Sequence, residues 1–589
     1  MTALWASAAT VPELLAHRAA ATPEGQAFVA VGVGVASSSL SWQQFADQAA
    51  RMAGALYTAG LRHGDRIAVL IPASIEWELL HHAVLSLGAI VVGLDAHDVP
   101  ERLAAMCDQV DVVAVVAPDF GPLAALSPER WQRLRFVMTQ SAGEGAAPVR
   151  SLGWAELLAL PAPQEPPRSP QPDDLATLIF TSGTTGTPKA IPYRHRQVCA
   201  AVHAIGEAFG FIGVGGRLLC WLPLSNLFQR MVNLAGLRNG ATTFVLSDPR
   251  QIMDVVALAS PDVFIGVPRF FEKLHQGIVA KLEELPPLQR RAAQWAWQVG
   301  RDVGRVRLAG GKPQRWLGLK HRAADRWVLS RLRTSVMGRR LRFMITGSAP
   351  TPPPLLTEFY ALGWPLLEAY GLSENVMPMA MNRIEDFRFG TVGKPFPGNE
   401  LAIGPDDTIL VRSACLARPA GDLAGTPVDA QGYYDTGDLG SIDADGFVRL
   451  SGRKSEVFKT STGRRVSPYA AEAALRAVPG IDQAVLVGAG RKCVVALCAT
   501  PAPVALSDRR ALQQALSAAV EGVGVHERPQ AIAMVPHAFT VEHGELTPNL
   551  KLRRAAIEQL HAEAIEAAYA GLGAVSGSAG RLLVVWPAE

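Results

Sequence analysis

Nine residues, Thr181 to Lys189, constrain this chain more than any other segment of its sequence; they read TSGTTGTPK. An apolar run over residues 175–180 precedes them and is typical of a buried β-strand. Glycines and small hydroxyl residues let backbone N–H groups turn toward an anion, and the closing lysine adds a positive charge. The order of residues differs from a Walker A loop, which ends in Gly-Lys-Ser or Gly-Lys-Thr. We therefore predict a polyphosphate-binding loop at the end of a strand, with an ordinary flexible turn as the less favoured alternative.

The sequence around this loop indicates an α/β architecture. Apolar runs at residues 66–72 and 112–118 are strand-like, and helical stretches alternate with them over residues 10–119. Such alternation is typical of a largely parallel sheet. Further strand-like runs at 263–268 and 341–347 are each followed by a turn signal, so the same architecture extends beyond the loop.

The length and the cysteine pattern limit the classes of protein to which this chain can belong. The 589 residues are enough for several domains, and the six cysteines lie far apart without a C-x-x-C pair. This spacing favours neither a zinc site nor a disulfide framework. The first residues lack the cationic start of a secretory signal, and the longest uncharged apolar stretch, residues 83–94, is shorter than the roughly 20 residues that span a bilayer. We expect a soluble, cytoplasmic protein.

Positive charge is concentrated in one segment, residues 281–342. It holds 16 Lys and Arg residues and four acids, whereas the whole chain has a net charge of only +3. Tryptophans are interleaved with the basic residues, and the segment is mostly helical in pattern. It is either a surface for anionic lipid headgroups at the inner face of the membrane or, more simply, a solvated helical insertion. No recognition motif accompanies the charge, so nucleic acid is not an expected partner.

Six segments, in order along the chain, resemble motifs of the adenylate-forming superfamily, which includes acyl-CoA synthetases, luciferases and nonribosomal-peptide adenylation domains. They are the loop at 181–189, GSAP at 347–350, EAYGLSE at 368–374, YDTGDLG at 434–440, GRK at 452–454 and ELTPNLKLRR at 545–554. The resemblance implies a large N-terminal α/β domain with parallel-rich sheets, helices and a β-subdomain. A small, mobile α+β C-terminal domain is expected to follow it.

The motifs also imply domain boundaries. We expect the N-terminal domain at residues 1–453, with 281–342 as a basic helical insertion, and a C-terminal lid at 454–571. The lid should end with a helix over residues 553–570 that stops at Gly571. The tail, residues 572–589, contains the strand-like run 581–587 and has no assigned role.

The resemblance implies a role for individual residues. Tyr370 is expected against the adenine, Asp438 at both ribose hydroxyls with Arg453 nearby, and Ser455 at the interdomain hinge. Glu374 is expected to hold Mg²⁺ with ATP, and Lys551 to act in adenylation. The catalytic set is thus Lys551, Glu374 and Thr181. The ATP and AMP site comprises Thr181, Ser182, Gly183, Thr184, Thr185, Gly186, Lys189, Gly347, Ser348, Ala349, Glu368, Ala369, Tyr370, Gly371, Asp438 and Arg453.

The chemistry explains why these residue types are needed. Joining a carboxylate to an α-phosphate brings two anions together, so the site must supply cations and dipoles where negative charge develops. Magnesium on Glu374, and Lys189 with its hydroxyl loop, can neutralise the departing pyrophosphate. Lys551 can bridge the carboxylate and the α-phosphate and so orient both.

Two regions resemble long-chain acyl-CoA synthetases in particular: the basic segment 281–342 and the ending LTPNLKLRR. This branch implies that a medium- to long-chain fatty acid and ATP give an acyl-adenylate, which coenzyme A converts to a thioester. The C-terminal domain is expected to swing between these two steps. The acyl site is expected to include Asn226 and Gly266.

Three positions depart from the pattern of that branch. Asn226 stands where it usually has histidine, Gln229 where it has an acid, and Ser455 where the hinge has Asp or Lys. Residues 409–427 also lack the Gly-Tyr pair that this branch has before the ribose motif, and together the departures indicate a divergent member. Two alternatives stay open: a ligase that loads an acyl carrier protein, since a carrier presents the same thiol as coenzyme A, and a non-catalytic nucleotide- or acyl-binding homologue. Histidines 81, 82 and 97 show no spacing with acids or cysteines that is typical of metal ligands, so no metal site is expected there.

Overall fold

The computed structural model describes residues 8–34, 38–140, 149–165, 167–181, 188–421, 423, 425–546, 552–574 and 582–587. Within these residues the largest sheet has seven strands in the order β7-β6-β5-β3-β4-β8-β9, all parallel except the β8–β9 pair. The strands are β3 (Arg66–Val69), β4 (Ile90–Gly93), β5 (Ala114–Ala117), β6 (Phe136–Thr139), β7 (Ser151–Leu152), β8 (Leu175–Thr181) and β9 (Lys189–Arg194).

Alternating side chains of this sheet belong to two different cores. Ile67 and Val69 of β3 pack into a core with helices on one face, whereas Ala68 packs into a second core on the other face. Burial on both faces explains why these strands read as continuous apolar runs. The helices here are α2 (Val11–Ala21), α3 (Trp42–Ala59), α4 (Ile75–Ser86), α5 (Pro100–Gln109), η1 (Gly121–Leu123), α6 (Pro128–Arg133), α7 (Trp154–Leu158) and α8 (His195–Ala208).

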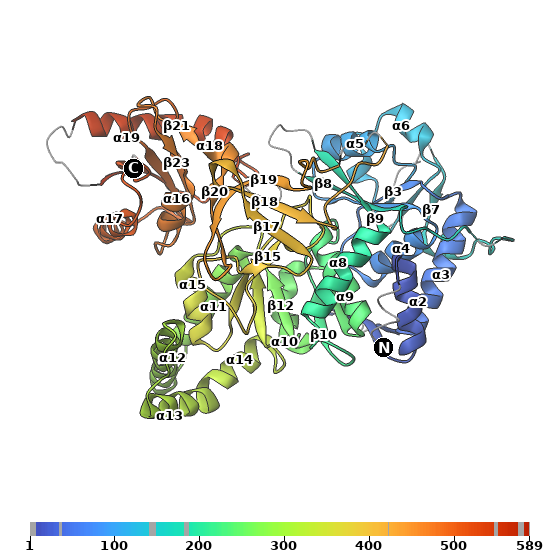
Figure 1. Cartoon of the computed structure of the whole chain (residues 1–589), viewed down its shortest axis with the longest axis horizontal. Helices are drawn as coiled ribbons and strands as arrows, with labels where there is room; N and C mark the ends of the chain where they lie inside the picture. The colour runs from blue at the N-terminus through green and yellow to red at the C-terminus, as the bar shows by residue number, and fades with distance from the viewer. Residues whose placement is uncertain are drawn as a thin grey trace.

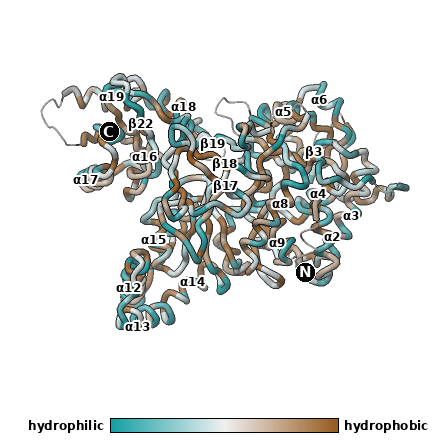
Figure 2. The backbone as a smooth tube through the Cα atoms, in the orientation of Figure 1, coloured by the Kyte–Doolittle hydropathy of each residue, from teal (hydrophilic) through white to brown (hydrophobic). Residues whose placement is uncertain are grey.

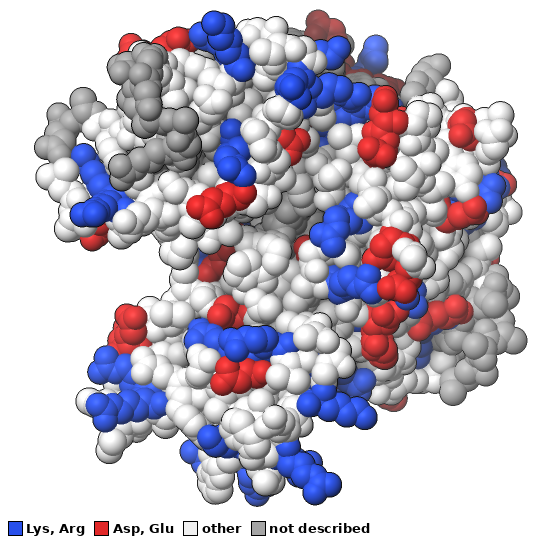
Figure 3. All heavy atoms as spheres, turned by 60° about the vertical axis from the view of Figure 1, so that its left-hand side comes forward, with Lys and Arg blue, Asp and Glu red and all other residues white. Residues whose placement is uncertain are grey.

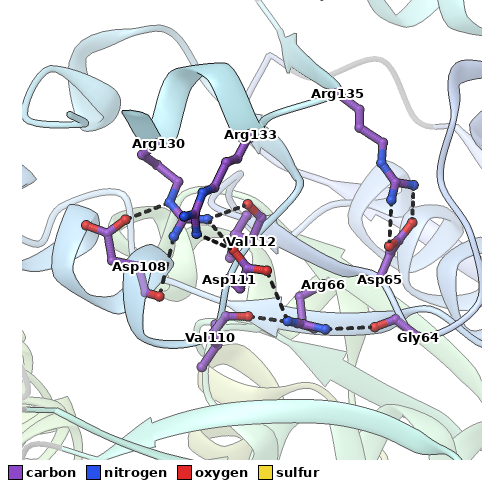
Figure 4. A network of polar contacts seen from close by, with 10 residues as sticks. All are labelled: Gly64, Asp65, Arg66, Asp108, Val110, Asp111, Val112, Arg130, Arg133 and Arg135. Carbon is purple, nitrogen blue, oxygen red and sulfur yellow. Dashed lines mark hydrogen bonds and ion pairs between the residues drawn. The ribbon is translucent and has the colours of Figure 1, made fainter. Parts of the chain in front are cut away.

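An ion-pair network lies at the amino-terminal ends of the strands of this sheet (Figure 4). Arg130 is buried, and its guanidinium reaches Asp108 at 2.6 Å and Asp111 at 3.0 Å. Arg135, just before β6, pairs with Asp65, just before β3, at 3.1 Å. The network therefore lies at the edge opposite to the carboxyl end of β8, where the predicted phosphate loop begins.

Two further sheets continue the N-terminal part. One has the order β10-β11-β1-β2 and the other the order β12-β13-β14-β15-β16, with β12 to β14 parallel. Their strands are β1 (Gln26–Val31), β2 (Ser39–Ser41), β10 (Arg217–Cys220), β11 (Thr242–Leu246), β12 (Val263–Gly266), β13 (Phe343–Thr346), β14 (Leu366–Tyr370), β15 (Ala380–Met381) and β16 (Lys394–Pro395). The associated helices are α9 (Leu227–Asn239), η2 (Pro249–Gln251), α10 (Ile252–Ala259), α11 (Pro268–Glu283) and α15 (Pro353–Ala361).

The basic segment is helical, as the sequence predicts. It forms α12 (Pro287–Leu308), α13 (Arg315–Ala324), η3 (Asp325–Leu329) and α14 (Ser330–Met337), and α12 with α13 projects from the lower left of Figure 1. Figure 2 shows hydrophobic segments along the sheets and hydrophilic ones on α12 and α13. No helix in the described ranges has the length and hydrophobicity that a membrane span requires.

An antiparallel sheet of four strands joins the N-terminal part to the C-terminal part. It comprises β17 (Asn399–Ile403), β18 (Thr408–Ser413), β19 (Tyr434–Ile442) and β20 (Val448–Arg453), with η4 (Pro405–Asp407) between the first two. Residues 422 and 424, between β18 and β19, lie outside the described residues. β20 ends at Arg453, and the short helix η5 (Lys454–Glu456) leads into the C-terminal unit at the upper left of Figure 1.

The C-terminal unit holds a mixed sheet in the order β23-β24-β25-β26 and a two-stranded ribbon. Its elements are β21 (Phe458–Lys459), β22 (Arg465–Val466), α16 (Tyr469–Arg476), β23 (Gln483–Val487), β24 (Val495–Ala499), α17 (Leu506–Val520), β25 (Ala531–Val535), α18 (Arg554–Leu560), α19 (Ala562–Ala574) and β26 (Leu583–Val585). The strand-like run of the tail does form a strand, because β26 pairs with β25 in parallel.

The expected last helix is wrong in two respects. It is broken at His561 into α18 and α19, and α19 continues through Gly571 to Ala574. Gly571 lies inside α19 and faces β26: a Cβ there would lie 2.7 Å from the end of the Leu583 side chain. Close packing, rather than helix termination, explains this glycine.

Candidate functional site

The predicted phosphate loop joins β8 to β9 at the carboxyl edge of the largest sheet. Thr181 and Lys189 are partners in the antiparallel register of these two strands. The five loop residues Ser182, Gly183, Thr184, Thr185 and Gly186 lie outside the described residues. Lys189 is exposed at the start of β9. Its side chain is therefore accessible to solvent at the carboxyl edge of the sheet.

Asp438 lies at the centre of a polar group where β14 and β19 meet. Tyr370, at the end of β14, donates its hydroxyl hydrogen to Asp438 Oδ2 at 2.6 Å. Arg453 Nε lies 2.9 Å from Oδ1, because Asp438 and Arg453 are register partners on β19 and β20. Burial raises the pKa of Asp438, while Arg453 and the Tyr370 hydroxyl oppose the shift. The Asp438 carboxylate is thus buried and held in one orientation by two donors.

The turn from Gly347 to Ala349 lies directly beside β14. A Cβ on Gly347 would lie 3.0 Å from the carbonyl oxygen of Ala369, so a side chain at this position would crowd the strand. Ser348 has a left-handed backbone with φ of 70°, which is uncommon outside glycine. The Gly347 end of this turn, between β13 and α15, therefore lies against Ala369 of β14, and the adenine side stays a prediction.

Glu368 has an unusual environment in this region. Its Oε2 atom is buried without a hydrogen-bond partner. Burial raises the pKa of Glu368 to about 7, and hydrogen bonds from the backbone of Gly390 and Thr351 oppose that rise only in part. An unpartnered buried carboxyl oxygen can accept a hydrogen bond from a ligand or, when protonated, donate one.

The structure adds Tyr469, which the sequence analysis did not identify. It is the first residue of α16 in the C-terminal unit, and a Cβ on Gly452 would lie 3.3 Å from its Cβ. Burial, and then the charges of Glu368 and Asp438, raise the pKa of Tyr469 to about 12. The C-terminal unit therefore contributes a side chain close to the group around Asp438. No sequence motif marks it, because only the packing of β20 against α16 brings it there.

Glu374 lies between strands from different sheets. Tyr193 of β9 donates its hydroxyl hydrogen to the carbonyl oxygen of Ser373 at 2.5 Å. Burial raises the pKa of Tyr434 on β19 to about 12, and Glu374 is the nearby charge that contributes most to that rise. The Glu374 carboxylate is half-buried near both tyrosines. Carboxylate oxygens are donors that Mg²⁺ prefers, so the chemistry of this side chain fits the expected metal.

The expected acyl residues lie at the ends of α9 and β12. Asn226 caps α9, and its side-chain oxygen accepts from the backbone N–H of Phe228 at 3.0 Å. Gly266 ends β12, and a Cβ there would lie 3.2 Å from the ring of Phe271. Aromatic side chains gather beside it, since Trp221 stacks on Phe264 with ring centroids 5.6 Å apart.

Gln229 belongs to a buried polar group that the sequence analysis did not identify. Its amide donates to Asn233 at 2.9 Å, and Asn233 donates to the Glu78 carboxylate at 2.7 Å. The neighbouring Arg230 is completely buried and donates to Thr177 at 2.7 Å. Burial lowers the pKa of Arg230 and raises that of Glu78 on α4, and the charge of each residue opposes the shift of the other.

This group alters the expectation for the histidines. His81 and His82 lie on α4 with Glu78, and their ligand atoms are within 4.8 Å of one another. Glu78 precedes these histidines by three and four residues, a spacing that places all three side chains on one face of a helix. The sequence analysis did not use this spacing. Burial, and then the charge of Arg230, lower the pKa of His81. The same burial and the charge of Arg230 disfavour a metal cation between Glu78, His81 and His82. His97 lies apart from this group; it is exposed, and its Nδ1 lies 3.1 Å from Asp95.

Lys551 lies outside the described residues, but both ends of its segment are anchored. Leu546 and Leu552 form a β-bridge, and the N–H of Arg553 donates to the carbonyl oxygen of Glu545 at 2.9 Å. Arg554 makes two hydrogen bonds, of 2.6 and 2.7 Å, to the buried Glu472. Ser455 is exposed in η5, between the last strand of the N-terminal part and β21.

Comparison with known proteins gives two family matches. Residues 15–413 match the family described as AMP-binding enzyme, and residues 456–573 match the AMP-binding enzyme C-terminal domain. The chain is 31% identical over 554 residues to the long-chain-fatty-acid–CoA ligase FadD15 of Mycobacterium tuberculosis, covering 89% of this chain and 91% of the relative. It is 28% identical over 455 residues to fatty acyl-CoA synthetase B of Dictyostelium discoideum, covering 68% and 64% of the two chains.

Solved structures share the fold. The o-succinylbenzoate CoA synthetase MenE of Bacillus subtilis, in complex with its acyl-adenylate, has a TM-score of 0.68 at 19% identity and covers 92% of this chain and 97% of its own. The anthranilate CoA ligase AuaEII, in complex with anthranoyl-AMP, has a TM-score of 0.70 at 19% identity and covers 95% and 98%. At these identities the likeness concerns the fold.

Proposed function

The chain belongs to the AMP-binding enzyme family, and from this premise we propose that it activates a medium- to long-chain fatty acid with ATP and transfers the acyl group to coenzyme A. The observation that carries the proposal is the buried carboxylate of Asp438, held by Tyr370 and Arg453 beside the turn at Gly347. It supplies a fixed acceptor for two neighbouring hydroxyls, which is what a ribose offers. The fatty acid as substrate is proposed because relatives that match over most of this chain are named fatty-acid–CoA ligases.

In the adenylation step the carboxylate of the fatty acid attacks the α-phosphate, and pyrophosphate leaves. Thr181 and Lys189 border the loop that would hold the β- and γ-phosphates, and Glu374 would hold Mg²⁺ beside them. Magnesium, when bound, neutralises charge on the phosphate oxygens. The ammonium of Lys551 would contact both the attacking carboxylate and the α-phosphate and so hold them in line.

In the thioester step the sulfur of coenzyme A attacks the acyl carbon and AMP leaves. The charge of Lys551 is not needed at this stage, and we propose that the C-terminal unit rotates about Ser455 to withdraw it. We also propose the boundary between the two units at residues 453 and 454, where β20 gives way to η5. Asn226 and Gly266, beside the aromatic cluster of Trp221 and Phe264, are proposed to border the acyl chain.

The test is acid-dependent release of pyrophosphate over a panel from acetate to long-chain and aromatic acids, with and without coenzyme A. We expect turnover to peak at medium or long chains, to depend on coenzyme A, and to be lost in Lys551→Ala. Lys492→Ala, which removes another exposed lysine of the C-terminal unit, is the matched control. Adenylate that a holo-carrier protein discharges and coenzyme A does not would replace the proposal by a carrier-protein ligase. ATP binding without pyrophosphate release for any acid would indicate a non-catalytic homologue.

We further propose a cytoplasmic protein that contacts anionic membranes through residues 281–342. All six cysteines are unpaired, as suits a reducing compartment. Lysine and arginine side chains crowd the protruding lobe in the lower part of Figure 3. Three tryptophans of this segment are well exposed: Trp295 by 44%, Trp316 by 55% and Trp327 by 62%. A basic surface with exposed aromatic rings is typical of proteins that bind lipid headgroups.

Sedimentation with anionic and with neutral vesicles tests this contact. We expect co-sedimentation with anionic vesicles at low salt, and a clear loss of it in the double variant Trp316→Ala and Trp327→Ala. A matched control is Trp297→Phe, because Trp297 is buried in the same helical segment. Equal sedimentation with neutral vesicles, or none with anionic ones, would contradict the proposal.

A further inference from the structure

A second group of metal-ligating side chains lies in the C-terminal unit, outside the group around Asp438. His537 follows β25, and His543 and Glu545 belong to the turn that comes next. One ligand atom from each of the three lies within 4.8 Å of the others. The side chain of Glu545 is buried, with 1% exposed, whereas that of His543 is 64% exposed. The group therefore combines a fixed carboxylate with an imidazole that solvent can reach.

The carboxylate is oriented by its neighbours. The N–H of Thr540 donates to Glu545 Oε2 at 2.9 Å, and Oε1 lies 2.7 Å from Nε2 of His561. Nδ1 of His537 lies 3.2 Å from the carbonyl oxygen of Ala538, which leaves its Nε2 available. Hydrogen bonds from neighbouring groups to metal-ligating side chains set the tautomer and direction of those side chains and strengthen metal binding.

We propose that His537, His543 and Glu545 bind a divalent transition metal ion of the Zn²⁺ type. Two neutral imidazoles and one carboxylate are a donor set that zinc accepts, with water in the fourth position. Magnesium and calcium prefer sites made of oxygen alone, so this ion is distinct from the Mg²⁺ that accompanies ATP. The ion would link the end of β25 to the turn that precedes Leu546.

The other histidine group of the described residues, formed by Glu78, His81 and His82, is a poorer candidate. It is completely buried, and the charge of Arg230 lies close to it. An ion there would have no path from solvent and would meet a like charge. The group in the C-terminal unit has solvent on one side, and its bound ion would strengthen the base of the segment that contains Lys551.

Isothermal titration of the metal-stripped full-length chain with zinc chloride tests the proposal. We expect one equivalent to bind at neutral pH, and the affinity to fall by roughly tenfold or more in His543→Ala and in His537→Asn. His97→Ala is the matched control, because His97 is also an exposed histidine, with 92% of its side chain accessible. Cys493→Ser controls for thiol binding, since Cys493 is the cysteine that is not fully buried.

Cobalt gives an independent readout, because tetrahedral Co²⁺ has strong visible absorption that the same two variants should abolish. Circular dichroism of both variants shows whether they are folded, and His543→Ala changes only an exposed side chain. No binding to the wild-type chain, or equal binding to His543→Ala and the wild type, overturns the proposal. Binding that is lost in His81→Ala instead also overturns it.

Discussion

At the scale of single residues, the environment of Asp438 explains why its neighbours matter. The residue is buried, yet it has two charged or polar donors, Tyr370 and Arg453. A buried carboxylate without such partners would be costly, and here burial raises its pKa. The donors are therefore needed to keep the acceptor ionised where the proposed ribose would lie.

We expect Asp438→Asn to raise the KM for ATP by about tenfold to a hundredfold. A hydrogen bond to a charged group contributes about 1.5–3 kcal/mol, and the amide both weakens that bond and adds an unwanted donor. The measurement is ATP-dependent pyrophosphate release. Asp435→Asn is the control, because Asp435 is an exposed residue of the same strand. An unchanged KM in Asp438→Asn would remove this residue from the nucleotide site.

Glu368 should make stability depend on pH. The folded chain holds its proton up to about pH 7, whereas the unfolded chain releases it near 4.5. The folded state therefore binds more protons between these values, and stability must fall as the pH rises from about 4.5 to about 7. The shift corresponds to about 3 kcal/mol.

Glu368→Gln removes the titrating group and should abolish this decline. The measurement compares the unfolding midpoints of wild type and variant across that pH range. Parallel curves for the two proteins would show that Glu368 does not titrate in the folded chain with a raised pKa.

At the scale of elements, close contacts between backbones decide where glycine is required. Helix α12 passes so near α15 that a Cβ on Gly300 would lie 2.1 Å from the carbonyl oxygen of Ala361. In the neighbouring α13, a Cβ on Gly318 would meet nothing within 4 Å. Both glycines occupy helix interiors, so helix propensity alone would treat them alike.

We therefore expect opposite effects from the same substitution. Gly300→Ala should lower stability by about 1–3 kcal/mol, because the helices must move apart. Gly318→Ala should raise stability by about 0.4–1 kcal/mol, because it reduces the freedom of the unfolded chain. Thermal unfolding midpoints of the two variants and the wild type measure the difference. A destabilised Gly318→Ala would contradict the open environment of that position.

At the scale of the whole molecule, the two family matches and the shared fold confirm the predicted superfamily and fold class. Among the described residues, side chains give few polar links between the two units. Arg269 on α11 pairs with Asp482 of the C-terminal unit, and Ser467 donates to the carbonyl oxygen of Ser451 at 2.9 Å. Such sparse contact is typical of units that move relative to each other.

Arg269→Ala should loosen this arrangement. We expect trypsin to cleave the exposed connection at Arg453 and Lys454 severalfold faster in the variant, because a less firmly held C-terminal unit lets this segment open locally more often. Arg250→Ala is the control, since Arg250 is exposed and pairs only with the nearby Asp248 among the described residues. Equal cleavage rates in wild type and Arg269→Ala would show that this ion pair does not hold the unit in place.

The sequence by itself determined the family, the α/β class and the order of the motifs. These depend on local features: a Gly- and Thr-rich loop after an apolar run, the TGD triplet within β19, and GRK at the end of β20. Only the tertiary structure placed Asp438 against both Tyr370 and Arg453, Tyr469 beside that group, and Glu78 with Arg230. Each of these contacts joins residues from different elements, so no spacing along the chain reports it. Gly571 shows the same limit: its local signal predicts the end of a helix, but the approach of β26 decides its role.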